Sequence, residues 1–281
     1  MDHLNDIRLE FELPEEEARL GRTQPLSPDR SLVTQQRVGD TVVKATVNRV
    51  QYGTYSGKPA CIVGLTFFFG FNGDTHGRFK SAGIEVRFSR AHGAHEPEED
   101  SHRIHIAQLG PREVWGAPTA TEIEQTTGVT MTVGGQAPAG GLSASIDPNI
   151  QRVYRTTVFK YRSIEGYTTS SHDSDEENVA VWKLKENAAQ KDGIFPEFQG
   201  AAIILLPETG VGAEAVLHVT PKVAFSLNPL TYFKLKQRRR DPIRFDGKTS
   251  KGEPVDQGKD FAEKDFSWPR VFQVPTEYQN R

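Results

Sequence analysis

The chain has a single cysteine, Cys61, among its 281 residues. One thiol cannot form an intramolecular disulfide, nor can it supply the several thiolates of a structural zinc cluster. Cys61 lies inside the most hydrophobic segment of the chain, ACIVGLTFFFGF, at positions 60–71. Because a reactive cysteine needs exposure and a cationic neighbour, we expect a buried, inert thiol in a central strand.

Long apolar runs and a strong net charge are also lacking. The longest apolar run is interrupted by Gly64 and Gly70, and it is shorter than the ~20 residues that a membrane helix needs. The net charge of −3 creates no general field that would recruit nucleic acid. The acidic N-terminal stretch, MDHLNDIRLEFELPEEE, has no apolar signal-peptide core, which predicts a cytoplasmic location.

Catalytic fingerprints are missing as well. The sequence contains no Gly-x-Ser-x-Gly elbow, no nucleotide-binding fingerprint and no Gly-Lys-Ser/Thr after its glycine-rich stretches. Four histidines and an acidic run gather within residues 89–105, namely His92, His95, His102 and His105 with Glu96, Glu98, Glu99 and Asp100. No His-x-His or His-Glu-x-x-His spacing orders them, so we expect a solvated loop, no metal and no cofactor.

The most informative stretch is NVAVWKLKENAAQKDGIFPEFQGAAIILLP, at positions 178–207. Apolar and polar residues nearly alternate around Trp182, which predicts a strand with one packed face. A polar turn with Gly193 follows. The uninterrupted apolar run at 201–206 then predicts a strand that is buried on both faces.

Short strands separated by turn signals recur along the chain and predict a mainly β protein. We expect a two-sheet β-sandwich of mostly antiparallel strands, with a β-barrel as the alternative, since single β domains run to about 250 residues. The expected organisation is an N-terminal strand and linker at 1–37, a sandwich domain at 38–246, and a flexible linker with an aromatic C-terminal tail at 247–281. Aromatic residues in that tail can dock onto the domain or onto a partner.

The stretch from Thr126 to Ile146, TTGVTMTVGGQAPAGGLSASI, predicts an amphipathic hairpin with a glycine-rich tip. Such a hairpin can be an ordinary surface feature, a lid over a ligand, or a membrane-inserting element. Each arm alternates cleanly over only about half of the ~9–11 residues that a membrane strand requires. That shortfall favours the ordinary hairpin.

A basic cluster ends a predicted short C-terminal helix that begins at Asn228 and Pro229. Its candidate anion-binding residues are Lys236, Arg238, Arg239 and Arg240. Lysine and arginine at this point can bind phosphate, nucleic acid or anionic lipid, or can simply complement the helix C-terminus. The second interpretation is favoured, so nucleic acid and membrane are not expected partners.

The stretch at positions 178–207, together with a motif at 241–246, resembles a group of uncharacterised proteins of filamentous ascomycete fungi. The resemblance lies in a Trp-x-Leu-x-Glu-Asn run (Trp182–Asn187), a Gly-Ile-x-Pro turn (Gly193–Pro196) and a closing Asp-Pro-Ile-x-Phe-Asp motif (Asp241–Asp246). This chain departs from the pattern by placing Phe195 between the isoleucine and the proline. The resemblance implies a cytoplasmic fungal β protein and transfers no activity and no site residues.

Three functions stay open on the sequence. The first, which the missing catalytic fingerprints favour over the other two, is a non-catalytic interaction or ligand-binding module whose partner is a small molecule or a protein. The second is a cofactor-free cyclase or isomerase, which needs only a shaped pocket with a few acid/base groups. The third is a lipid-binding or pore-forming protein that uses the predicted hairpin. Candidate pocket residues for a ligand are His105, Trp115, Tyr161 and Trp182.

Overall fold

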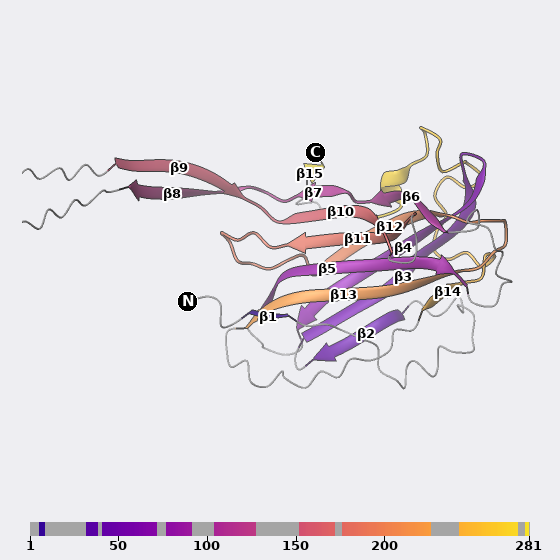
Figure 1. The fold of residues 1–281 in the computed structure, drawn as a ribbon, viewed down its shortest axis with the longest axis horizontal. Coiled ribbons are helices and arrows are strands. Elements are labelled where there is room, and N and C mark those ends of the chain that lie inside the picture. Colours follow the sequence, from indigo (N-terminus) through magenta and orange to yellow (C-terminus); the bar gives the residue numbers. More distant parts are fainter. Residues whose placement is uncertain are drawn as a thin grey trace, which may run out of the picture.

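Two stacked antiparallel sheets form the body of the molecule in a computed structural model (Figure 1). The structure describes residues 6–8, 32–38, 41–71, 77–91, 104–127, 152–171, 176–225, 242–274 and 279–280. Among these residues neither sheet closes on itself, and every strand pair is antiparallel. The predicted two-sheet sandwich is therefore confirmed, and the barrel alternative is not.

The eight-stranded sheet has the order β1-β13-β5-β11-β10-β7-β15, with β14 paired to β13. Its strands are β1 (Asp6–Arg8), β5 (Gly77–Arg90), β7 (Glu113–Trp115), β10 (Ser163–Ser170), β11 (Glu177–Lys185), β13 (Ala213–Phe225), β14 (Ile243–Phe245) and β15 (Gln279–Asn280). Trp115, expected in a loop, lies in β7. The reason is local pairing, because Trp115 lies opposite Ser163 of β10.

The five-stranded sheet has the order β2-β3-β4-β12-β6. Its strands are β2 (Leu32–Val38), β3 (Thr41–Tyr55), β4 (Lys58–Phe71), β12 (Glu197–Leu205) and β6 (His105–Gly110). The two strands predicted from uninterrupted apolar runs, β4 and β12, pair with each other at the centre of this sheet. Cys61 is fully buried in β4, which confirms the predicted burial in a central strand, and burial raises the pKa of its thiol.

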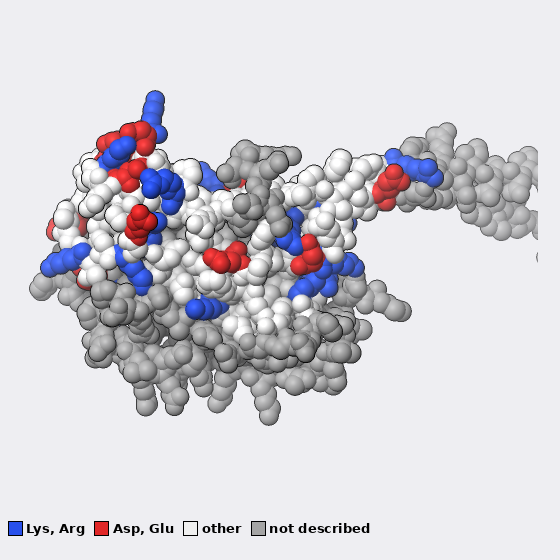
Figure 2. Space-filling model, turned by 180° about the vertical axis from the view of Figure 1, so that it is seen from behind, with Lys and Arg blue, Asp and Glu red and all other residues white. Residues whose placement is uncertain are grey.

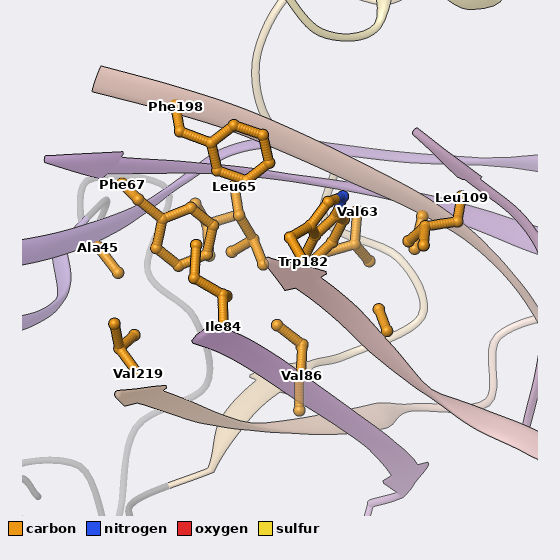
Figure 3. Packing of buried hydrophobic residues seen from close by; sticks show 14 of the residues in the cluster. Ala45, Val63, Leu65, Phe67, Ile84, Val86, Leu109, Trp182, Phe198 and Val219 are labelled. Atoms are coloured by element: carbon orange, nitrogen blue, oxygen red, sulfur yellow. The ribbon is translucent and has the colours of Figure 1, made fainter. Parts of the chain in front are cut away.

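The main core lies between the two sheets. Figure 3 shows Phe67 and Leu65 of the five-stranded sheet facing Ile84 and Trp182 of the eight-stranded sheet. Trp182 has no exposed surface, and its ring centroid lies 5.9 Å from that of Phe198 in an edge arrangement. Burial of such large side chains is the main source of stability in a sandwich.

A second apolar cluster covers the outer face of the five-stranded sheet. The segment at 247–274, including the short 3-10 helix η4 (Trp268–Arg270), packs its aromatic residues there. Phe261, Phe266 and Phe272 are buried with Ile62 and Ile203. Burial on both faces explains why β4 and β12 read as continuous apolar runs.

Polar contacts also tie this C-terminal segment to the body. The Gln51 side chain donates to the carbonyl of Val255 and accepts from its N–H, both at 2.8 Å. The Asp260 carboxylate accepts from the N–H groups of Ser56 (2.8 Å) and Gly57 (2.9 Å) in the β3–β4 turn. These contacts place the predicted linker region and its aromatic residues against the sandwich.

Candidate functional site

A two-stranded ribbon projects from the body and forms a sheet of its own (Figure 1). It consists of β8 (Thr119–Thr127) and β9 (Arg152–Lys160), paired in continuous register from Thr119 opposite Lys160 to Thr127 opposite Arg152. No other described strand pairs with β8 or β9. Because an isolated two-stranded hairpin is marginal in water, contacts at its base must orient it.

The buried side chain of Asn187 joins both strands at that base. Its Nδ2 donates to Thr119 Oγ1 at 2.9 Å and to the carbonyl oxygen of Lys160 at 3.1 Å. Its Oδ1 accepts from the N–H groups of Ala189 at 2.9 Å and Gln190 at 3.4 Å. Asn187 is only 1% exposed, so one amide links the first residue pair of the ribbon to the turn after β11.

Aromatic and ionic contacts lie beside this amide. The rings of Trp115 and Tyr161 meet edge to face with centroids 4.4 Å apart. Arg162 pairs with Asp192 and covers the ring of Phe195 at 4.7 Å. The two segments that lead into and out of the ribbon are thus both held against the body.

The four candidate pocket residues occupy three separate places. Trp115 and Tyr161 are in contact at the ribbon base. Trp182 lies in the core between the sheets, and His105 lies in β6, opposite Leu205. The ribbon-base residues Asn187 and Thr119 were not among the sequence candidates, since their partners are distant in the chain.

The remaining candidates cannot be placed. Lys236, Arg238, Arg239 and Arg240 lie outside the described residues, as do the predicted helix that carries them, the histidine loop at 92–103 and the hairpin residues 128–151. Within the described part of the chain, no group of three or more His, Cys, Asp or Glu side chains could hold a metal ion. No helix in that part has the length and hydrophobicity needed to cross a bilayer.

A cavity of about 330 Å³ lies between β3 and the C-terminal segment. Its lining includes Gln51, Tyr52, Thr54, Lys251 and Phe261. Burial raises the pKa of the Tyr52 hydroxyl, which is the opposite of what a general base requires. The titratable side chains in its lining are Tyr52, Lys251 and Lys259.

Comparisons with known proteins give a distant likeness only. No family model and no curated protein matches the chain. One similar solved structure is described as a pore forming protein, with 8% identity, a TM-score of 0.30, and coverage of 78% of this chain and 86% of that one. Another is the Clostridium perfringens NetB toxin in its membrane inserted form, with 10% identity, a TM-score of 0.25, and coverage of 74% and 93%. TM-scores below 0.5 define neither the fold nor the function.

Proposed function

We propose that this chain is a pore-forming protein whose ribbon, together with the intervening segment 128–151, inserts into a membrane as one β-hairpin. The observation that carries the proposal is the register of the described ribbon. Every residue pair between β8 and β9 has numbers that add to 279. The midpoint of that register falls between Ala139 and Gly140, inside the glycine-rich sequence GGQAPAGG. Such residues are typical of hairpin turns.

Continuing the same register in the inserted state gives the hairpin two unlike faces. Residues on opposite strands that pair directly share a face, and alternate residues along a strand share it too. One face then combines the apolar residues of both arms: Val129, Met131, Val133, Leu142, Ala144, Ile146 and Ile150. The other face combines hydroxyl and amide residues with one carboxylate, Asp147: Thr126, Thr130, Thr132, Ser143, Ser145, Asn149 and Gln151. Alternation of apolar and polar faces is the pattern of a transmembrane barrel strand.

The length of the arms also suits a bilayer. The first arm has no charged residue over the 15 positions 125–139, and the second has one, Asp147, over the 12 positions 140–151. A tilted membrane strand needs about 9–11 residues. The paired region is longer than the stretch from Thr126 to Ile146 suggests, because β8 and β9 extend it towards the body. Pro148 removes one ladder hydrogen bond from the second arm.

A single hairpin cannot remain in lipid as the only inserted sheet. Its outer edges would expose unpaired N–H and C=O groups to the hydrocarbon, and only closed barrels avoid that cost. The smallest common membrane barrels have eight strands, so about four or more copies must contribute one hairpin each. The functional form is therefore an oligomer, with each body outside the bilayer.

Dye release from vesicles of phosphatidylcholine and phosphatidylserine tests the proposal. The unmodified chain at micromolar concentration should release the dye. Replacing Val129 and Val133 by arginine should abolish release, because arginine on the lipid face costs about 2–4 kcal/mol near the bilayer midplane. The matched pair Thr130→Arg and Thr132→Arg adds the same charge to the polar face and should retain release.

Two results would overturn the proposal. If the vesicles stay intact with the unmodified chain, the protein does not form pores in them and the proposal is wrong. If the two arginine pairs affect dye release equally, the hypothesis that the hairpin has one lipid-facing side and one polar side is wrong. The ligand-binding module and the cofactor-free enzyme then stay as predictions from the sequence.

A further inference from the structure

The described part of the ribbon carries an uneven set of charges on its polar face. Glu122 of β8 pairs with Thr157 of β9, and Glu124 pairs with Arg155 two positions further along. These positions share a face with residue 126, which begins the hydroxyl-rich face described above. Figure 2 shows both acidic and basic side chains on the ribbon among otherwise uncharged residues.

One guanidinium stands against two carboxylates on this face. Arg155 lies directly opposite Glu124 and diagonally across from Glu122, within reach of a long side chain. The side chains of Glu122 and Arg155 are both exposed. The sequence between the two strands, residues 128–151, contains no lysine or arginine that could offset the second carboxylate, and its one charged residue, Asp147, adds a further negative charge to the same face in the extended register.

The cations Lys160 and Arg152 occupy the opposite face. They pair with Thr119 and Thr127, whose odd-numbered positions in β8 alternate with those of Glu122 and Glu124. Alternate residues of a strand point to opposite faces. Hence these two cations do not neutralise the carboxylates on the polar face.

We propose that Glu122 and Glu124 form a net negative ring at the body-side mouth of the pore and make the pore selective for cations. This inference rests on the proposed function, in which several copies place the polar face towards a shared lumen. Rings of aspartate or glutamate attract cations and repel anions because each copy repeats the same charge around the axis. The permeating species are small hydrated cations such as potassium.

Current recordings in planar bilayers with a gradient of potassium chloride test this inference. The unmodified pore should show a reversal potential displaced towards the potassium equilibrium potential. The double variant Glu122→Gln, Glu124→Gln should reduce the potassium-to-chloride permeability ratio by about twofold or more, since it leaves Arg155 without an opposing glutamate and changes the net charge of this group from negative to positive. The selectivity should also weaken between 0.1 M and 1 M salt, where the Debye length falls from about 10 Å to about 3 Å.

Two further variants test the position of the charge. Thr121→Glu adds a carboxylate to the opposite face and should leave the permeability ratio unchanged. Glu208→Gln removes an exposed carboxylate from a loop of the body and should leave both conductance and selectivity unchanged.

The possible failures are distinct. Absence of any conductance would overturn pore formation and the selectivity with it. A conductance that is non-selective or anion-selective would overturn the inference and leave the proposed pore intact. Cation selectivity that survives the double glutamine variant would exclude Glu122 and Glu124 as its source.

Discussion

The body and the ribbon are built from the same kind of strand but are stabilised in opposite ways. The body buries Trp182, Phe67 and Phe198 completely between two sheets and has a second apolar cluster on its outer side. Among the described strands, each strand of the ribbon pairs only with the other, and the ribbon is linked to the body at one end through Asn187. The body is therefore the rigid part of the molecule. The ribbon can move from water into another environment without disturbing the core of the body.

The typical free energies of apolar burial and of hydrogen bonds support this division between a stable body and a weakly held ribbon. Apolar burial contributes about 25 cal/mol per Å², so a sandwich core supplies the larger share of the folding free energy. A hydrogen bond contributes about 0.5–1.5 kcal/mol net, so the few polar contacts at the ribbon base are individually modest. The ribbon can therefore open locally at a lower cost than the body.

The largest expected effect is in the core. Trp182→Ala should lower the free energy of unfolding by about 3–5 kcal/mol, because it leaves a large cavity between the sheets. Chemical denaturation measures this loss. Tyr167→Ala, at a side chain that is 41% exposed, is the control and should change stability by less than about 0.5 kcal/mol. Equal effects of the two variants would mean that the core does not dominate stability.

An intermediate effect is expected at the ribbon base. Asn187→Ala leaves buried polar groups unpaired and should cost about 1–3 kcal/mol. Its signature is local: amide hydrogen exchange should accelerate in β8 and β9 while β4 and β12 keep their protection. Thr119→Val removes only one of the contacts of Asn187 and should have a smaller effect of the same kind.

Uniform acceleration of exchange throughout the Asn187→Ala variant would contradict the division. It would show that Asn187 supports the whole fold. No change in the ribbon would show that Asn187 does not orient it.

The smallest effect is expected in acid, at the contact between the C-terminal segment and the β3–β4 turn. Hydrogen bonds from Gly57, Ala262 and Ser56 lower the pKa of Asp260 to about 2. Its unfolded value is about 3.9, so this stabilising contribution is present above about pH 4 and is lost as the pH falls through 2. Residues 247–272 should become more sensitive to pepsin between pH 4 and pH 2 than the body. An Asp260→Asn variant with an unaltered pH dependence would assign the change to other groups.

The sequence predicts the body much better than the ribbon. Strands β4 and β12 are buried on both faces, so their uninterrupted apolar runs mark them directly. Strand β8 reads TATEIEQTT, in which Ile123 is the sole large apolar residue. Because no second sheet packs against this strand in the described part of the chain, its sequence shows no alternation of apolar and polar residues that would identify it as a strand. The sequence pattern therefore does not mark β8 as a strand.

Tertiary contacts explain what else the sequence could not predict. Asn187 reads as a turn residue, and its bonds to Ala189 and Gln190 agree with that reading. Its second role depends on Thr119 and Lys160, which are 68 and 27 residues away. Trp115 and Tyr161 are also far apart in the chain, and the sequence, which offers both as candidate pocket residues, does not predict that their rings meet.

The most direct test of membrane insertion labels single cysteines introduced into the proposed hairpin, which is practical because the native Cys61 is buried. Because Cys61 is fully buried and the pKa of its thiol is raised, single cysteines introduced at positions 129–133 can be labelled selectively with an environment-sensitive dye. On addition of vesicles, dye fluorescence should rise at positions 129, 131 and 133 and stay low at 130 and 132. An absent change, or a rise without this alternation, would contradict insertion of a two-faced hairpin.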